Sequence, residues 1–471
     1  MGATEAHYGL SPLTFLTRLA GFAGQPVNSA SLNLFRFLFG LFMFVEAIRF
    51  LLHQWVDTYL LSSAVLFKYP GLEWVRLLPG DWLYIHFCLI ALLAIMVALG
   101  VFYRLAIVAL TLSFGYVFLL EQALYLNQYY LLLTISFLLC FMPAERGFSI
   151  DTTRRRESFE CLIPFWNIAA LRFQFEVMLI YAGIVKLNPD WLRGEPLTLW
   201  LKQRTDIPVI GSWLGTPGLG ETASIAVIAL HLIGAPLLLI RKTRLAVFLL
   251  YVPFHLANSM LFHIGLFPWI TLAGTLLFFD PDWPLEIWRR YQGGRETIHE
   301  TSPKVAMPYR ASALTLTIIV VFLVSQVLIP MRAVFYPGRA SWTGEGDWFA
   351  WRMKLDDKVC TSTFTVTDLE NGLRRTVNPE DHLNARQLEL LPSNPDMLLQ
   401  FAQHLQLVTF KSAEPDQVEV RAEIYCALNG RQAQLLVDNN LDLTQVERSW
   451  RHYTWIQPLT VALRETNKAS Q

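Results

Sequence analysis

Long apolar segments constrain this chain more than any other feature of its sequence. A helix needs roughly 20 mostly apolar residues to cross the hydrocarbon core of a bilayer, and nine segments approach that length. They lie near 31–52, 83–103, 105–121, 126–143, 166–186, 222–240, 244–263, 266–280 and 311–330. The composition agrees, because 54% of the residues are apolar and 16% are charged, against about 25% charged residues in soluble domains. We therefore expect residues 1–330 to form a polytopic, all-α membrane domain of about nine transmembrane helices.

Basic residues in the short loops predict the orientation. Loops rich in Lys and Arg alternate along the chain with loops that are poorer in these residues. The rich loops contain Arg104, the run 154–156, the basic residues of 241–244 and the stretch 289–310, and the poorer loops lie at 53–82, 121–126 and 187–221. Because Lys and Arg concentrate in cytoplasmic loops, the pattern predicts an integral protein of the inner or plasma membrane with a cytoplasmic N-terminus. The run from Ser31 to Leu52 is too long for a cleaved signal and indicates a retained span.

Residues 331–471 have a different character, with more charge and no long apolar runs. An odd number of spans places this region outside the cytoplasm. Alternating stretches at 360–367 and 418–427 predict strands, and Asn429-Gly430 predicts a two-residue hairpin turn. An amphipathic helix is expected over 385–406. The pattern indicates an extracytoplasmic α+β domain with antiparallel β-hairpins.

Cysteine and charge counts exclude several classes of protein. The five cysteines show no CxxC spacing, which argues against a zinc centre or a thioredoxin-like centre, and we expect no metal. Cys360 and Cys426 both lie in the predicted extracytoplasmic domain, where a disulfide persists; two free buried thiols are the alternative. Lys and Arg together number 38, and so do Asp and Glu. Because the net charge is zero, we expect no positive field that would attract nucleic acid.

Ionisable residues inside membrane spans are costly and therefore informative. Arg36, Glu46 and Arg49 interrupt the first span, and the three-residue spacing of Glu46 and Arg49 predicts a structural pair along one helix face. Arg172 and Glu176 in the fifth span are four residues apart, and the same argument predicts a structural pair there.

Lys186 differs from these residues because it ends an apolar helix just before Asn188, Pro189 and Trp191. One interpretation is a lysine that extends to the membrane interface beside an aromatic residue. The other is a catalytic base, because desolvation lowers a lysine pKa from about 10.4 towards neutrality. An uncharged amine could then take a proton from a phenolic substrate.

Two further polar clusters fall in the same predicted half of the membrane. His255, Asn258 and Ser259 share a face of the seventh span, His263 lies near its outer end, and Asn127-Gln128 begins the fourth span. A hydrogen-bond network between helices is one explanation for the seventh-span residues, and catalysis is the other. Convergence of these residues with Lys186 predicts a pocket that is open to lipid-soluble molecules and close to the external domain.

Several segments of the chain resemble the vitamin K-dependent γ-glutamyl carboxylase family and its wider relatives, the horizontally transferred transmembrane domain (HTTM) proteins. The resemblance is carried by AGIVKLNPDW at 182–191, PFWN at 164–167 with Leu171-Arg172, FHLANSMLFHIGLF at 254–267, and WIQPL at 455–459. These motifs cover both the membrane region and the tail. They indicate a bacterial homologue of the carboxylase.

The resemblance implies a chemistry and a set of partners. Family members oxygenate reduced vitamin K with O2, and the strong base that results removes a γ-proton from a protein glutamate, which then captures CO2. The epoxide is the coproduct. By resemblance, Lys186 is the base that deprotonates the hydroquinone and His255 contacts the quinol, with Asn127, Gln128, Asn258 and His263 lining the pocket. The expected co-substrates are reduced vitamin K or menaquinone, O2 and CO2, and the expected partners are the bilayer and a secreted polypeptide at the external domain.

Two positions depart from the family pattern and leave alternatives open. Val185 replaces the first lysine of the family's lysine pair, and Gln128 replaces a histidine associated with carboxylation. Glutamine forms hydrogen bonds but does not titrate as histidine does. A hydroquinone epoxidase without glutamate carboxylation is therefore one alternative, and a non-enzymatic membrane scaffold or chaperone for secreted proteins is another. A transporter is not favoured, because no matching broken helices mark two halves.

Overall fold

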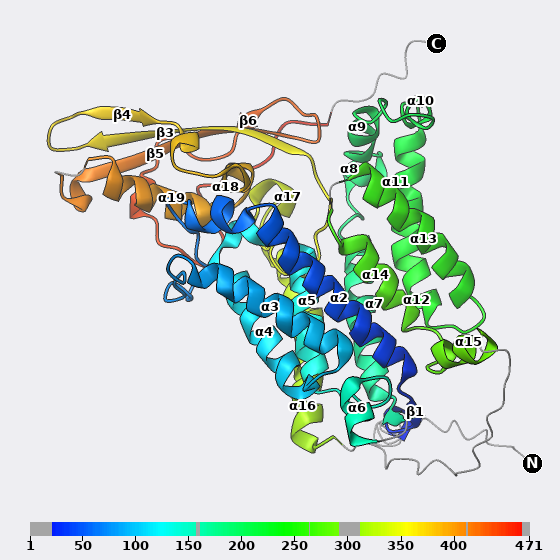
Figure 1. Cartoon of the computed structure of the whole chain (residues 1–471). Helices are drawn as coiled ribbons and strands as arrows, with labels where there is room; N and C mark the ends of the chain where they lie inside the picture. The colour runs from blue at the N-terminus through cyan, green and yellow to red at the C-terminus, as the bar shows by residue number, and fades with distance from the viewer. Residues whose placement is uncertain (1–20, 157–160, 263, 292–310, 411–412, 464–471) are drawn as a thin grey trace, which may run out of the picture.

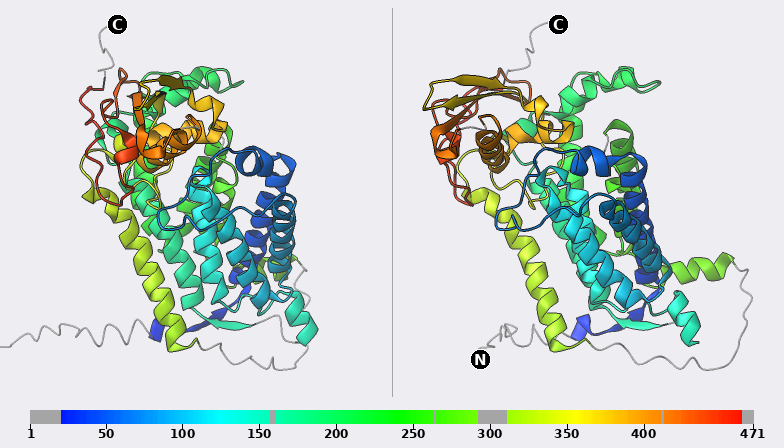
Figure 2. Two further views of the ribbon diagram at one scale, coloured as in Figure 1. Left: turned by 90° about the vertical axis from the view of Figure 1, so that its left-hand side faces the viewer. Right: turned by 60° about the vertical axis from the view of Figure 1, so that its left-hand side comes forward.

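A bundle of long helices carries a sheet with short helices at one end of the molecule, as the views of Figures 1 and 2 show. The computed structural model describes residues 21–156, 161–262, 264–291, 311–410 and 413–463. Strand β1 (Pro26–Asn28) pairs antiparallel with β2 (Leu162–Pro164) at the opposite end of the bundle, where α6 (Ile150–Arg155) also lies. Residues 292–310 of the predicted basic stretch lie outside the described residues, as does His263.

Each of the nine apolar segments contains a helix. These helices are α2 (Ala30–Leu52), α3 (Trp82–Leu99), α4 (Tyr103–Leu120), α5 (Asn127–Cys140), α7 (Trp166–Ile184), α11 (Leu219–Ala229) with η3 (Leu230–Gly234) and α12 (Ala235–Leu238), α13 (Arg244–Leu261), α14 (Phe267–Leu276) and α16 (Ala313–Met331). Among the described residues, five helices are long and apolar enough to cross a membrane: α3, α4, the 219–238 helix, α13 and the helix over 313–335. Helices α5 and α14 have only 14 and 10 residues. The number of nine spans therefore stays a prediction.

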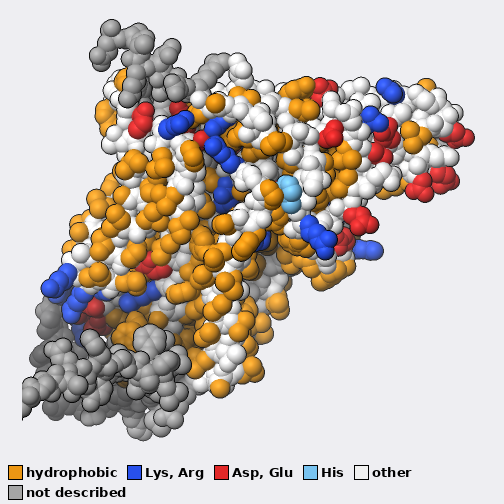
Figure 3. All heavy atoms as spheres, turned by 180° about the vertical axis from the view of Figure 1, so that it is seen from behind, with side chains coloured by type: hydrophobic (Ala, Val, Ile, Leu, Met, Phe, Trp, Pro, Cys, Tyr) orange, Lys and Arg blue, Asp and Glu red, His pale blue; other side chains and the backbone are white. Residues whose placement is uncertain are grey.

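The surface of the bundle is typical of a protein in lipid. Figure 3 shows hydrophobic side chains spread over the helical body, while charged side chains gather towards its two ends. Large apolar residues such as Leu249, Leu314 and Val321 are exposed on α13 and α16. Such a surface is stable where hydrocarbon is the solvent.

The C-terminal part of the chain that lies outside the helical bundle, which we call the external domain, contains an antiparallel sheet in the order β4-β3-β5-β6. Its strands are β4 (Arg374–Val377), β3 (Lys358–Asp368), β5 (Val418–Leu428) and β6 (Gln434–Leu435). The predicted strands at 360–367 and 418–427 are confirmed as parts of β3 and β5. Alternate residues such as Val366 and Val420 are buried against Phe401 of α19 (Pro395–Val408), so one face of the sheet packs on this helix.

Two local predictions in the external domain were wrong in detail. The turn at Asn429-Gly430 has the expected positive φ values of 52° and 73°, but the loop between β5 and β6 extends over 429–433 and is longer than two residues. The helix predicted over 385–406 is broken into α18 (Ala385–Leu390), a 3-10 turn at Leu391–Ser393 and α19. Pro392 and Pro395 explain the break, because proline lacks the N–H that a continuous helix needs.

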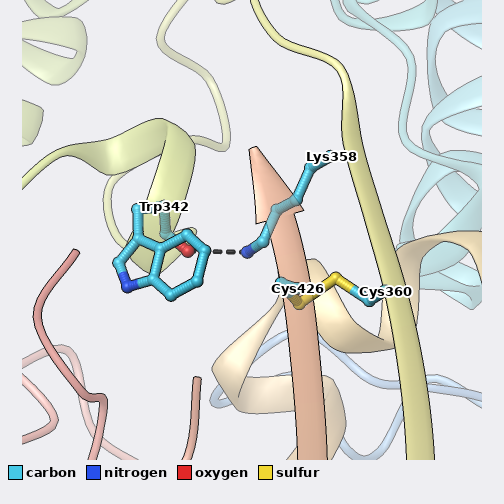
Figure 4. Close-up of a disulfide and its surroundings, with 4 residues drawn as sticks. All are labelled: Trp342, Lys358, Cys360 and Cys426. Carbon is cyan, nitrogen blue, oxygen red and sulfur yellow. Dashed lines mark hydrogen bonds between the residues drawn. A yellow bond between two sulfur atoms is a disulfide. The ribbon is translucent and has the colours of Figure 1, made fainter. Parts of the chain in front are cut away.

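Cys360 and Cys426 form a disulfide between directly opposed residues of β3 and β5, as Figure 4 shows. The alternative of two free thiols is therefore wrong for this pair. Two residues away, the ammonium of Lys358 donates a hydrogen bond of 2.6 Å to the carbonyl oxygen of Trp342. Burial lowers the pKa of Lys358 to about 8.

Candidate functional site

Lys186 occupies a tight turn between α7 and the short helix α8 (Pro189–Leu192). The side chain of Asn188 caps α8 by accepting hydrogen bonds from the backbone N–H groups of Asp190 and Trp191, which fixes where the chain turns. Lys186 is only 5% exposed. It is therefore buried, and the arrangement favours the desolvated amine over a lysine that extends to the interface.

The contacts of the Lys186 amine come from backbone oxygens and an aromatic ring. Nζ donates to the carbonyl oxygen of Ala182 at 2.8 Å and to that of Met353 at 3.3 Å. It also lies 5.1 Å from the ring centre of Trp191. Within the described ranges, the charged group that acts on Lys186 is the cation Arg352, and no carboxylate forms an ion pair with it.

Residues 348–355, which we call the covering segment, close the site from the side of the external domain. Asn127 at the start of α5 donates to the carbonyl oxygen of Arg352 at 3.2 Å, and Lys186 donates to the next carbonyl, that of Met353. The indole N–H of Trp191 donates to the carbonyl of Leu355 at 2.7 Å. The covering segment thus brings two of the predicted site residues, Asn127 and Lys186, under adjacent peptide groups.

The backbone of the covering segment is strained. Phe349, Trp351 and Lys354 have φ values of 58°, 55° and 45°, a region that bulky side chains rarely adopt. Aromatic contacts hold the segment in place, since the ring of Tyr130 lies 5.1 Å from that of Phe349 and 4.7 Å from that of Trp351. Strain of this kind persists only where surrounding structure enforces it, and it is concentrated at functional sites.

Asp190 fixes the Lys186 turn to the external domain. Arg431 binds both carboxylate oxygens of Asp190, at 2.7 and 2.8 Å, and Asn429 donates to one of them at 2.8 Å. Arg339 adds a bond of 3.1 Å. Burial favours the protonated acid, but the hydrogen bonds from Arg431 and Asn429 outweigh it and hold the pKa of Asp190 below its ordinary value.

Gln128 belongs to a neighbouring cluster. Its amide lies against Gly265, where an added Cβ would be 3.0 Å from Oε1 of Gln128. Beside it, Glu46 accepts hydrogen bonds from Arg49 at 2.8 Å and from the hydroxyl of Tyr129 at 2.6 Å. The predicted Glu46–Arg49 pair is confirmed.

A small, mostly apolar pocket lies between α2, α3, α4 and α5. Glu46 and Tyr129 are polar members of its lining, and the rest is apolar, including Phe50, Phe87 and Phe118. Lys186 is not among the lining residues. The pocket therefore adjoins the Gln128 cluster and not the lysine.

His255 is buried in α13, and the other predicted residues of that helix face partly outward. The ring atom Nε2 of His255 is buried and has no hydrogen-bond partner among the described residues. Asn258 is half-buried and donates to the carbonyl of Phe254 in its own helix at 2.8 Å, while Ser259 is exposed. The described contacts of Asn258 therefore do not join it to another helix, whereas His255 retains an unused polar atom.

The predicted pair of Arg172 and Glu176 was wrong. Arg172 instead donates to the carbonyl oxygens of Leu277 at 2.7 Å and Phe279 at 2.9 Å, just beyond the end of α14. Both carboxylate oxygens of Glu176 are buried without a partner in the described part of the chain. The free carbonyls at a helix C-terminus compete for the guanidinium, and spacing along one helix does not reveal them.

Three residues near Lys186 were not identified from the sequence. His231 lies in the π-helical turn η3 and packs against α7 at Gly183. Arg352 and Lys354 belong to the covering segment, and the amine of Lys354 lies 5.6 Å from the ring of Trp200. His231 could have been noticed in the sequence, because it is an ionisable residue within an apolar segment. The positions of Arg352 and Lys354 depend on contacts between distant parts of the chain.

Comparison with family models agrees with this architecture. A model of the HTTM domain matches residues 24–283, which is more than half of the chain, and a model of the vitamin K-dependent gamma-carboxylase lumenal domain matches 311–462. The chain belongs to the vitamin K-dependent gamma-carboxylase family. No solved structure shows a significant match to it. The family assignment indicates a carboxylase-like function that depends on vitamin K, and it places the external domain of this chain among lumenal domains.

Proposed function

We propose that this protein is a membrane enzyme that oxygenates a reduced naphthoquinone, vitamin K or menaquinone, to its epoxide and couples this reaction to carboxylation of glutamate in a polypeptide. Lys186 is the base in this proposal. The observation that carries it is the burial of the Lys186 amine among carbonyl oxygens and an aromatic ring.

The surroundings of Lys186 suit a base that starts uncharged. A buried amine is harder to charge than one in water, and Lys186 is buried with carbonyl oxygens and an aromatic ring as its contacts. When Lys186 takes the proton of a phenolic hydroxyl, the new ammonium has acceptors in place, namely the carbonyl oxygens of Ala182 and Met353. The site can therefore receive a proton without a buried carboxylate.

Two of the predicted residues would hold the reduced quinone in this proposal. His255 supplies a buried ring nitrogen without a partner, and Asn127 supplies an amide beside Lys186 under the covering segment. These side chains would hold the polar oxygens of the ring system, and the ring of Trp191, whose centre lies 5.1 Å from the Lys186 amine, is an aromatic group beside the base. When bound, the reduced quinone would be the molecule that reacts with O2. In this proposal the external domain receives the polypeptide, and Asp190 couples that domain to the base.

A second candidate is a hydroquinone epoxidase that does not carboxylate glutamate. Gln128 favours it, because this residue replaces a titratable histidine and lies in the Glu46–Tyr129 cluster, separate from the contacts of Lys186. A scaffold for secreted proteins is a third candidate, in which burial of Lys186 serves only packing.

Product analysis separates these candidates. Purified protein in lipid nanodiscs would receive reduced menaquinone or reduced vitamin K, O2, labelled bicarbonate and a glutamate-containing peptide, with an anaerobic reaction as control. The coupled reaction predicts O2-dependent epoxide together with label in the peptide. Epoxide without label would establish the epoxidase instead. Folded protein that binds quinone and forms no epoxide with either quinol would contradict both enzymatic candidates.

A further inference from the structure

Helix α15 (Trp283–Tyr291) leaves the bundle at the end opposite the external domain. The right-hand view of Figure 2 shows it extending from the side of the bundle, across the direction of the long helices. The backbone N–H of Ser31, at the start of α2, donates to the carbonyl oxygen of Pro281 at 3.0 Å, just before α15 begins. This bond fixes the beginning of α15 to the bundle.

The side chains of α15 divide between two faces. One face carries apolar and aromatic side chains, and the opposite face carries charged ones. The first face includes Ile287, Trp288 and Tyr291, and the second consists of Glu286, Arg289 and Arg290. Of the nine residues of the helix, only Leu285 is buried. The apolar face is therefore not used in packing α15 against the described part of the bundle.

The exposed apolar face needs an apolar environment. Ile287, Trp288 and Tyr291 are 58%, 53% and 87% exposed. Large apolar side chains gathered on one exposed face mark a surface that contacts a membrane or a partner. Ile240 and Leu245, which flank the basic residues of 241–244, are also exposed, so the lipid-facing surface of the bundle reaches this level. Tryptophan and tyrosine are enriched where a bilayer meets water.

Basic side chains gather at the same end of the bundle. Arg241 and Arg244 form ion pairs with Asp280, at 3.2 and 3.5 Å, just ahead of α15. Arg289 and Arg290 lie on the charged face of the helix. The positive residues of these loops predict this end to be cytoplasmic. Anionic lipids give the cytoplasmic leaflet a negative surface that attracts basic segments, so charge favours an anionic lipid surface as the partner of α15.

We propose that α15 lies in the plane of the membrane surface and binds anionic phospholipid. Ile287 and Trp288 face the acyl chains, and Arg289 and Arg290 face the headgroup phosphates. Amphipathic helices of this composition bury their apolar face about 5–10 Å into the boundary between headgroups and acyl chains. Because the start of α15 is bound to α2, the helix would fix the depth of the bundle in the leaflet. This inference is independent of Lys186 and of the proposed reaction.

Site-directed fluorescence tests where the apolar face lies. Single cysteines would replace Trp288 on the apolar face and Glu286 on the charged face, both of which are exposed. The three cysteines outside the disulfide, Cys88, Cys140 and Cys161, would first be changed to alanine. Each single-cysteine protein would carry a bimane fluorophore and would be studied in nanodiscs of phosphatidylcholine and phosphatidylglycerol, where both membrane surfaces are open to solutes.

Two quenchers then distinguish lipid from water. Phospholipid with a nitroxide on its acyl chain should quench the fluorophore at position 288 more strongly than the one at position 286, and iodide in the water should quench in the opposite order. Equal responses at the two positions to either reagent would overturn the inference. Quenching of position 288 by neither reagent would also overturn it, because protein would then cover the apolar face.

The choice of lipid headgroup is the second readout. The nitroxide is placed on phosphatidylglycerol or on phosphatidylcholine at the same mole fraction, and stronger quenching of position 288 by the anionic lipid is expected. Arg289→Gln with Arg290→Gln should lower this preference by about threefold to tenfold. The matched control is Arg374→Gln with Arg375→Gln, two exposed arginines of β4 in the external domain, which should keep the preference. Equal quenching by the two lipids, or equal losses in the two double variants, would contradict the inference.

Discussion

At the scale of single residues, Asp190 determines whether the Lys186 turn stays attached to the external domain. The carboxylate of Asp190 is buried and binds Arg431 through both oxygens. Asp190→Ala leaves the guanidinium of Arg431 buried without its partner, which we expect to cost about 3 kcal/mol in the free energy of unfolding. Denaturant unfolding in detergent would measure this, with the exposed Asp206→Ala as control. Equal stability of the two variants would contradict the account.

The same carboxylate predicts an acid sensitivity. Hydrogen bonds hold the pKa of Asp190 below its ordinary value, so the unfolded chain binds its proton more readily than the folded chain. The stabilisation is therefore present above the unfolded pKa of about 3.9 and is lost as pH falls through the lower folded pKa. Asp190→Asn should lose this part of the pH dependence below about pH 4.

Sequence alone predicted the residues whose signal is local. Lys186 and Asn127 were identified because a polar residue beside an apolar helix is costly, and the structure places both under the covering segment. His231 was not identified because its position near the Lys186 turn comes from the approach of η3 to Gly183, which the sequence does not reveal. The Arg172–Glu176 pair failed for a related reason, since carbonyl groups from α14 compete for the guanidinium.

At the scale of elements, the crossing of α2 and α3 depends on Gly40. An added Cβ there would lie 2.5 Å from the backbone nitrogen of Ala98, so the helices must separate. Gly40→Ala is expected to destabilise the protein by about 2 kcal/mol. In Gly115→Ala, the control, the nearest contact is Leu133 at 3.6 Å, and helix propensity predicts no loss. Unfolding in SDS would compare them, and equal loss in both would argue against a close crossing.

The disulfide between β3 and β5 is the second element-scale prediction. The two cysteines are 66 residues apart in sequence, and a cross-link over such a loop restricts the unfolded chain. The Cys360→Ser, Cys426→Ser double variant should be less stable by about 2–4 kcal/mol. Thermal unfolding with and without reductant would test this, because the reductant should lower the melting temperature of the wild type and not that of the variant.

Strands and helices in which apolar residues recur at a regular spacing could be predicted from the sequence. The positions at which helices break or change their winding were harder to predict. Strands β3 and β5 follow from alternation of apolar residues. The break between α18 and α19 was missed although Pro392 and Pro395 signalled it. The π-helical turn η3 has no comparable sequence signal, because its extra residue per turn depends on how the helix packs on α7 and α13.

At the scale of the whole molecule, the candidate site exists only where the helical bundle and the external domain meet. The bundle contributes Lys186 and Asn127, and the covering segment contributes the carbonyl groups that contact them. Further contacts join the two parts, such as the bond from Gln122 to Asp396 at 2.8 Å and that from Gln387 to Glu121 at 3.0 Å. This arrangement would place a polypeptide on the external domain close to the base in the bundle.

The central claim is that Lys186 is the base, and the rate of epoxide formation by Lys186→Ala tests it most directly. Lys202→Ala is the matched control, since Lys202 is an exposed lysine of α9 (Leu197–Lys202). Both variants would be checked for folding and quinone binding before O2-dependent epoxide is measured from reduced menaquinone or vitamin K. Loss of a general base predicts a rate for Lys186→Ala that is about 10² to 10⁴ times lower, with Lys202→Ala equal to wild type. A folded, quinone-binding Lys186→Ala protein that forms epoxide at the wild-type rate would contradict the account.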